Sequence, residues 1–346
     1  MAKFAFIVNP VELNNIYQQF PFSRILPKII LKKALRLLPP LKIAQTRKFL
    51  SPAGEEIQGY FIALPLLSEQ IRELDETDAV KRLTLCIDLC RRLQVDIIGV
   101  GAAAATIGNG LEEISKQCEI PLTNGSSLGS AAILEVIEKA AILKHIDLKN
   151  TKLAIIGATN AVGQNCSLEF SRQVASLSLI AKNEQRLIEL NKYLLAQHIT
   201  AQIEINPANA PEAVKCADIV IFTASAGEIN FKTTADSFKK GAIVCDMPAS
   251  RNITRKIALT RKDILVIDTD VIKPPQTIDL GFSLPQIGKG NLFACIAETI
   301  LLTLEKKFDR NFSVGFKPDL NKTKEILTIA KKHAYKIAFT SFNQEI

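Results

Sequence analysis

Cys295 has the sequence context of a nucleophile. It lies in the segment GNLFACIAETILLTLE, Gly290–Glu305, which predicts a helix with Asn291 as its N-cap. A thiol in the first turn of a helix has a lowered pKa, and its thiolate is the reactive form. The alternative is a small buried residue that only packs the helix. Glu298 follows about one turn later, either as a group for proton transfer or as an ordinary helix residue.

A second candidate site is the segment KLAIIGATNAVG, Lys152–Gly163. Its apolar run is typical of a strand buried on both faces, and a glycine turn and a helix-compatible stretch follow. Such a turn directs backbone N–H groups at an anion, with the positive end of the helix dipole behind them. Asn160 replaces the middle glycine of the wider-spaced glycine pattern, and Asn tolerates left-handed backbone. An ordinary turn without a ligand is the alternative. The residues expected to bind the cofactor here are Gly157, Ala158, Thr159, Asn160, Ala161, Val162 and Gly163.

Basic residues follow the next apolar strand pattern, Leu177–Ala181. In NAD-binding folds an acidic residue at this strand end holds the ribose 2′-hydroxyl. Here the chain has Lys182, Asn183 and Arg186, which suit a 2′-phosphate and predict NADPH. A solvated helix start is the alternative. After the third strand pattern, the residues expected to complete the cofactor site are Thr223, Ala224 and Ser225.

The spacing of the apolar runs predicts the architecture. Strand patterns separated by helix-length segments indicate an α/β fold with a Rossmann-like, doubly wound parallel sheet. The later strand patterns are 218–223, 242–246 and 264–268. We expect an N-terminal α/β lobe for substrate and partner (1–148), an NADP-binding domain (149–290), and C-terminal helices (291–346) that pack across the cleft.

The polar turn TNGSSLG, Thr123–Gly129, precedes another helical pattern. Its amide and hydroxyl groups suit a polar substrate group, so we expect Gly125, Ser126 and Ser127 to bind substrate. A helix cap is the alternative.

The net charge of +8 is unevenly distributed. No Asp or Glu occurs between Leu13 and Gly54, and the pattern KIILKKALRLL reads as a basic amphipathic helix. Residues 20–48 therefore suit an anionic membrane surface or an acidic protein. The alternative is a surface helix packed on its own domain. We expect no nucleic acid partner, because the basic stretch lacks interleaved aromatic residues and the chain has no Trp.

The seven cysteines show no disulfide or metal-ligand spacing, so we expect a reducing, cytoplasmic location and no metal site. The first residues, MAKFAFIVNP, read as a strand and not as a signal peptide. No apolar run reaches the roughly 20 residues that span a bilayer. Any membrane association is therefore expected to be peripheral.

The sequence resembles the cyanobacterial-type long-chain fatty acyl-[acyl carrier protein] reductases over most of its length. The likeness is clearest in GATNAVG followed by LIAKNEQRL, in LFACIAETILLTLE, and in KKHAYKIAF. It implies NADPH-dependent reduction of a fatty acyl thioester, carried by acyl carrier protein or CoA, to an aldehyde. The family's acyl-accepting cysteine stands in an F-A-C-x-A-E segment, which only Cys295 matches. The resemblance therefore implies that Cys295 attacks the thioester and that hydride from NADPH releases the aldehyde.

The chain also departs from that family. Its turn reads GATN where the family has G-A-T-G. The segment GVGAAAAT lacks two hydroxyl groups that the family has in the corresponding Gly-Gly-Phe-Ser-Ser-like run, and the basic run Leu13–Gly54 is not part of the family pattern. Two other hypotheses stay open: a shikimate- or amino-acid-dehydrogenase-like NADP oxidoreductase, and a non-catalytic nucleotide-binding, membrane-associated protein. The first shares the two-domain plan, but its lysine motif has no clear match here.

Overall fold

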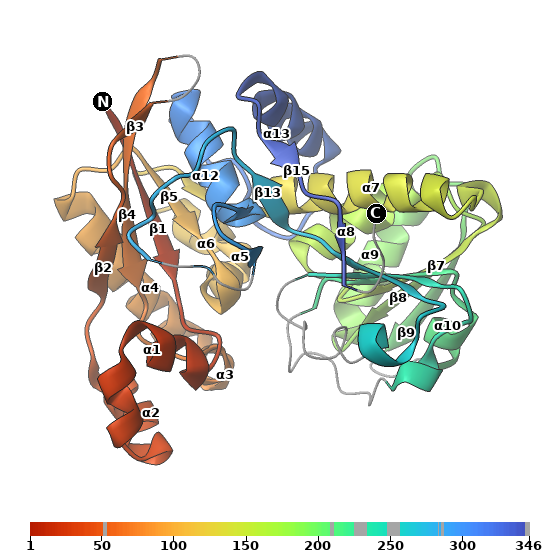
Figure 1. Cartoon of the computed structure of the whole chain (residues 1–346), viewed down its shortest axis with the longest axis horizontal. Coiled ribbons are helices and arrows are strands. Elements are labelled where there is room, and N and C mark those ends of the chain that lie inside the picture. Colours follow the sequence, from red (N-terminus) through yellow and green to blue (C-terminus); the bar gives the residue numbers. More distant parts are fainter. Residues whose placement is uncertain are drawn as a thin grey trace. The chain divides into compact units, whose positions relative to one another are not determined.

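The chain folds into two compact units, each with its own sheet (Figure 1). The computed structural model describes residues 1–50, 54–207, 211–224, 234–247, 257–282, 284 and 287–342. Unit 1 contains Met1–Leu128, Ile272–Gly315 and Glu325–Lys336, and unit 2 contains Gly129–Val271, Phe316–Lys324 and Ile337–Ile346.

These units differ from the domains expected at 1–148, 149–290 and 291–346. The chain changes unit at Leu128, inside the expected N-terminal lobe, and the expected C-terminal domain is divided between the units. The physical reason is that helix α12 (Ala294–Leu304) packs on strands β1 (Ala2–Val8) and β5 (Ile97–Val100) of the first sheet. A late segment therefore completes the core of unit 1.

Unit 2 is built on a seven-stranded sheet of order β16-β12-β11-β10-β7-β8-β9. Six strands are parallel, and β16 is antiparallel to β12. The bounds are β7 Lys152–Ile156, β8 Ser176–Ala181, β9 Gln202–Pro207, β10 Ile219–Phe222, β11 Ile243–Asp246, β12 Leu265–Asp268 and β16 Thr340–Ser341. Counted along the unit, the parallel strands have the order 3-2-1-4-5-6 of dinucleotide-binding sheets. The expected Rossmann-like α/β fold is confirmed.

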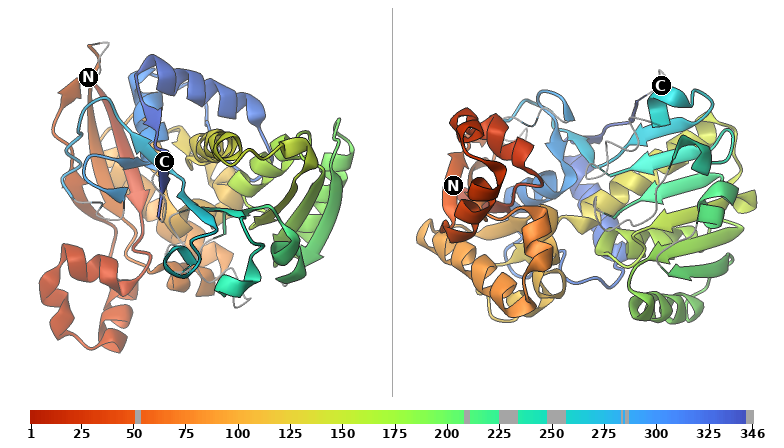
Figure 2. Two further views of the ribbon diagram at one scale, coloured as in Figure 1. Left: turned by 45° about the vertical axis from the view of Figure 1, so that its right-hand side comes forward. Right: turned by 90° about the horizontal axis from the view of Figure 1, so that it is seen from below.

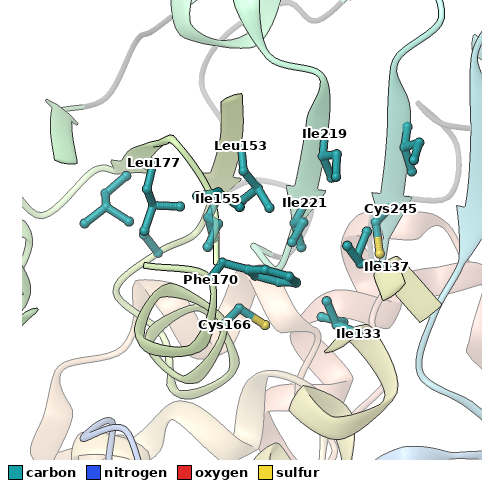
Figure 3. Close-up of a cluster of buried hydrophobic side chains, with 14 of the residues drawn as sticks. Ile133, Ile137, Leu153, Ile155, Cys166, Phe170, Leu177, Ile219, Ile221 and Cys245 are labelled. Atoms are coloured by element: carbon teal, nitrogen blue, oxygen red, sulfur yellow. The ribbon is translucent and has the colours of Figure 1, made fainter. Parts of the chain in front are cut away.

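Helices cover both faces of this sheet (Figure 2). Their bounds are α7 Ser126–Leu143, which begins in unit 1, α8 Ala161–Phe170, α9 Glu184–Leu195 and α10 Pro211–Cys216, with short helices η3 Leu148–Asn150 and η4 Ala235–Ser237. Helix α13, Leu320–Lys332, is divided between the two units. On one face Phe170 of α8 packs beneath Ile155 and Ile221, beside Ile133 of α7 (Figure 3). Burial on both faces explains why the strands read as unbroken apolar runs.

Unit 1 contains a six-stranded sheet of order β2-β4-β1-β5-β6, with β3 paired to β4. Strands β1, β4 (Glu56–Ala63), β5 and β6 (Leu122–Thr123) are parallel, whereas β2 (Leu41–Gln45) and β3 (Phe49–Leu50) are antiparallel to β4. The other helices are α1 Leu13–Gln19, η1 Pro21–Ile25, α2 Lys28–Leu37, α3 Ser68–Glu73, α4 Glu76–Arg92, η2 Ala102–Thr106, α5 Ile107–Gly110 and α6 Glu112–Ser115. A third sheet has the order β14 (Leu292–Phe293), β13 (Val271–Lys273), β15 (Lys336–Ile337).

None of the helices in the described part of the chain has the length and apolar composition needed to cross a bilayer.

Phe170→Ala tests the packing of unit 2. The Phe170 side chain is fully buried, so its loss should lower the free energy of unfolding by about 3–5 kcal/mol. Leu195→Ala removes a side chain that is 61% exposed and should change it by less than about 0.5 kcal/mol. Denaturant unfolding measures both values. Equal values for the two variants would contradict the assignment of Phe170 to the core.

Candidate functional site

Two glycines shape the turn between β7 and α8. Gly157 has a φ of +92°, and a Cβ there would lie 2.6 Å from the backbone nitrogen of Ala224. A Cβ on Gly163 would lie 2.3 Å from the carbonyl oxygen of Gly157. Both positions therefore exclude a side chain, because the end of β10 and the start of α8 approach the turn closely. The turn lies between β7 and β10, where the strand order reverses and this fold binds ligands.

Asn160 does not adopt the left-handed conformation that an Asn residue tolerates. Its φ and ψ are −83° and 169°, and it is the N-cap of α8. Its Oδ1 accepts a hydrogen bond from Gly163 N–H at 2.8 Å, and its Nδ2 donates to the Thr223 carbonyl oxygen at 2.9 Å. The Thr223 hydroxyl donates to the Gly157 carbonyl oxygen at 3.0 Å. An N-cap needs extended backbone and an accepting side chain, so Asn suits this position without left-handed φ.

The first turn of α8 keeps backbone donors for an anion. The N–H groups of Ala161 and Val162 have no acceptor within the helix, because the first N–H groups of any α-helix lack one. The Gly163 N–H is used by the Asn160 cap. Donors of this kind hold the pyrophosphate in dinucleotide-binding folds. The turn therefore has the backbone geometry that a nucleotide cofactor requires.

The end of β8 carries the expected basic residues. Asn183 is the N-cap of α9 and accepts from Arg186 N–H at 2.9 Å, and Lys182 is exposed. The Arg186 guanidinium lies 4.7 Å from the centre of the Phe316 ring, a cation–π distance. Phe316 lies far from Arg186 in the sequence, and its local sequence pattern did not indicate a contact with the cofactor-site residues. The expected residue Ser225 lies outside the described residues.

Cys295 is the second residue of α12 and is partly exposed. The N-cap of α12 is Phe293, so the expectation that Asn291 would cap the helix was wrong. The reason is that strand β14 keeps the backbone extended through Phe293, and the Asn291 amide instead donates to the Ile287 carbonyl oxygen at 2.6 Å. Cys295 nevertheless lies in the first helical turn.

Two glycine segments of unit 1 meet at Cys295. A Cβ on Gly125, whose φ is +76°, would lie 2.3 Å from Cys295 Cα, and a Cβ on Gly101 would lie 3.5 Å from Cys295 Sγ. Gly101 directly follows β5, and Gly125 follows β6 after one residue. Cys295 therefore lies at the carboxyl ends of parallel strands, the edge at which α/β sheets bind ligands. Among the expected substrate residues, Gly125 is the one placed against the sulfur-bearing residue.

The loop after β5 is held in an unusual conformation beside Gly101. Ala102 is exposed and has a φ of +54°, which costs a non-glycine residue about 1–2 kcal/mol. The buried Asn9 side chain accepts from Ala104 N–H at 3.0 Å and thereby orders the loop. Backbone strain of this kind is concentrated at functional sites. The sequence offered no signal for Asn9.

Glu298 is fully buried and accepts hydrogen bonds from three donors. They are the Thr123 hydroxyl, Leu128 N–H at 2.7 Å and the Ser313 hydroxyl at 2.7 Å. Leu128 lies in the first turn of α7, where the helix dipole favours negative charge. The Glu298 carboxylate thus joins α12 to the segment that carries Gly125.

The same network includes Ser127, one of the expected substrate residues. Ser127 is 3% exposed, and its Oγ lies 2.8 Å from Ser313 Oγ. Its hydroxyl is therefore engaged inside the fold, and a contact between Ser127 and substrate stays a prediction. Ser126 N–H donates to Asn124 Oδ1 at 3.0 Å, which is the turn geometry expected before a helix.

The environments of the other thiols separate them from Cys295. Burial raises the pKa of Cys86 to about 12 and raises that of Cys90, Cys166 and Cys245 further. These four thiols stay protonated at neutral pH and are unreactive. Cys118 is partly buried, and burial also raises its pKa. Cys216 is exposed. Within the described ranges, no group of three or more His, Cys, Asp and Glu side chains could hold a metal ion.

Comparisons with known proteins include two relatives at low identity. No protein-family model matches the chain. The chain is 25% identical over 295 residues to the aminotransferase PigE of Serratia sp., covering 83% of this chain and 33% of PigE. It is 24% identical over 288 residues to the long-chain acyl-[acyl-carrier-protein] reductase of Synechococcus elongatus, covering 80% of this chain and 81% of the reductase. The chain thus spans about a third of the length of PigE but most of the reductase.

The similar solved structures include two dehydrogenases. L-tryptophan dehydrogenase from Nostoc punctiforme has a TM-score of 0.41 at 14% identity, over 96% of this chain and 80% of that chain. Quinate dehydrogenase from Corynebacterium glutamicum, solved in complex with NAD, has a TM-score of 0.41 at 11% identity, over 94% of this chain and 98% of that chain. The fold assignment itself rests on the strand order of unit 2.

Glu298→Gln tests the buried carboxylate network. The substituted amide places a donor against a donor, so the free energy of unfolding should fall by about 1–3 kcal/mol. Glu73→Gln is the matched control, because Glu73 is paired with Arg36 on the surface and should change the value by less than about 1 kcal/mol. Denaturant unfolding measures both. A Glu298→Gln protein as stable as the control would show that the network does not hold α12.

Proposed function

We propose that this chain is an NADPH-dependent oxidoreductase that converts a fatty acyl thioester to an aldehyde through an acyl-enzyme at Cys295. The observation that carries the proposal is the position of Cys295, in the first turn of α12, against Gly101 and Gly125. The F-A-C-x-A-E segment and the 24% identity over most of the Synechococcus elongatus reductase support the substrate class.

The first half of the reaction uses unit 1. The Cys295 thiolate attacks the carbonyl carbon of the thioester, and the carrier leaves as a thiol after it takes up a proton. The positive end of the α12 dipole favours the negative charge that develops there. The missing side chains at Gly101 and Gly125 leave their backbones close to the sulfur-bearing residue. The product is an acyl group bound to Cys295 as a new thioester.

The second half needs a hydride, which NADPH supplies when it is bound. Addition of that hydride to the carbonyl carbon of the Cys295 thioester would break the C–S bond, so that Cys295 would leave as the free thiolate and the aldehyde would be released. The residues that would hold the cofactor are in unit 2. Ala161 and Val162 N–H would bind the pyrophosphate, and the absence of side chains at Gly157 and Gly163 would allow it to approach the backbone. The basic residues at the end of β8 would bind the 2′-phosphate.

An NADP-dependent dehydrogenase of shikimate or amino-acid type is the second candidate. The dehydrogenases among the similar structures match nearly the whole chain and support the coarser assignment of an NAD(P)-dependent oxidoreductase. Both candidates need the cofactor turn, but only the thioester reductase needs Cys295. A non-catalytic nucleotide-binding protein needs neither an acyl adduct nor turnover. A test of Cys295 therefore separates the three.

Cys295→Ser is that test. We expect the parent protein to form a covalent adduct with a long-chain fatty acyl-CoA, seen by intact mass, and to oxidise NADPH as it forms aldehyde. The variant should lose both, since a serine hydroxyl has no comparable anion at neutral pH, and should still bind NADPH. Cys216→Ser is the matched control, because Cys216 is exposed and lies outside the proposed site.

Two results would overturn the mechanism or the substrate class. If the Cys295→Ser variant kept wild-type turnover, a mechanism through an acyl-enzyme at Cys295 would be excluded. The parent protein could also form neither an adduct nor an aldehyde with acyl-CoA or with acyl carrier protein thioesters. That result would exclude fatty acyl thioesters as the substrate class. NADPH-dependent oxidation of a small hydroxy or amino acid would then favour the second candidate.

Arg186→Ala tests the choice of cofactor. The loss of a charged contact to the 2′-phosphate should weaken NADPH binding about tenfold or more and leave NADH binding unchanged. Phe316→Leu removes the ring against the guanidinium and should produce a smaller loss in the same direction. Lys192→Ala, at the other end of α9, is the control. Cofactor fluorescence titration gives the dissociation constants, and equal losses for both nucleotides would exclude 2′-phosphate recognition.

A further inference from the structure

Unit 1 exposes large apolar side chains around helix α2. Phe22 is 72% exposed, Ile25 85%, Ile29 71%, Ile30 52% and Leu37 85%. They come from η1 and α2, which with α1 form an extension at one end of the unit 1 sheet (Figures 1 and 2). Single exposed apolar residues are ordinary, but a cluster on one segment marks an interaction surface.

Helix α2 has two apolar faces, and the rest of unit 1 buries only one of them. Leu31 and Leu35 point inward and pack with Ile16 and Leu67. Ile29 and Leu37 lie two helical turns apart along the outer row, with Lys33 between them. Packing on the protein itself, the alternative considered from the sequence, therefore accounts for the inner face and leaves the outer one unexplained.

Some basic side chains of this segment form ion pairs within unit 1, and others are exposed. Lys32 pairs with Glu69 at 2.6 Å, and Arg36 pairs with Glu73 at 2.5 Å. Arg24, Lys28 and Lys33 are exposed and stand among the outer apolar side chains. No Asp or Glu occurs from Leu13 to Gly54, so no carboxylate of that stretch offsets them.

We propose that this surface binds an anionic lipid bilayer and inserts its apolar side chains at the headgroup level. We define the α2 surface as Phe22, Arg24, Ile25, Lys28, Ile29, Ile30, Lys33 and Leu37. Alternation of apolar and basic residues along an exposed row is the pattern of interfacial helices, in which lysine stems lie along the apolar layer and the charges reach the headgroups. An acidic protein would pair with charge and would not need five exposed apolar side chains. The proposal stands independently of the proposed activity, although a fatty aldehyde also partitions into bilayers.

Vesicle sedimentation with the full chain tests the proposal. The protein should sediment with phosphatidylcholine vesicles that contain phosphatidylserine, far less with pure phosphatidylcholine, and less as salt is raised. Lys28→Gln with Lys33→Gln should lower the partition coefficient about fivefold for each charge. The triple change Ile25→Asn, Ile29→Asn and Leu37→Asn should lower it at least tenfold at constant charge.

The controls use the same chemistry away from the α2 surface. Ile142→Asn removes a side chain that is 75% exposed elsewhere, and Lys32→Gln removes a charge that is already paired; both should bind like the parent. Circular dichroism checks that each variant is folded. A folded triple variant that binds as well as the parent would overturn insertion. If the parent protein bound neither type of vesicle but bound an acidic carrier protein, the assignment of a lipid bilayer as the partner would be overturned.

Discussion

A buried carboxylate holds the candidate active site together. Burial of Glu298 in an apolar helix is unfavourable unless its carboxylate receives hydrogen bonds. Its donors include Thr123 and Leu128, on either side of Gly125, and Ser313. Thr123 and Leu128 flank Gly125, and Gly125 touches Cys295, which lies one helical turn before Glu298. The hydrogen-bond network around this carboxylate therefore also holds the glycine turn beside Cys295. This explains why a helix from the last sixth of the chain belongs to the N-terminal sheet.

In unit 2 a single polar side chain has a comparable role at the glycine turn between β7 and α8. Asn160 caps α8 with its oxygen and binds Thr223 with its nitrogen, so one side chain joins β7, α8 and β10 at the point where the strand order reverses. A glycine at this position would supply flexibility but no such link. The departure from the glycine pattern therefore preserves the turn by a different physical means, and the close approaches at Gly157 and Gly163 remain.

Local patterns in the sequence determined five strands of unit 2 and their order along the chain, but they did not mark β9 or β16. Short apolar runs such as Leu153–Ile156 mark strands buried on both faces, because burial there depends on the residues of the strand itself. The same holds for the glycine turn at Gly157 and for the first-turn position of Cys295, which follow from neighbours in the chain. The Rossmann-like fold and the two candidate sites therefore follow from local sequence patterns.

Only the tertiary structure decided which distant residues meet. Gly101 and Gly125 against Cys295, Phe316 against Arg186, and the burial of Ser127 all join segments far apart in the sequence. Such contacts depend on how whole elements pack, and no local spacing encodes them. For the same reason the amphipathic pattern of α2 identified its apolar residues but could not say that the fold would cover one face and expose the other. The sequence determined which groups this protein possesses, and packing decided which of them are neighbours, which are buried, and which remain available to a ligand.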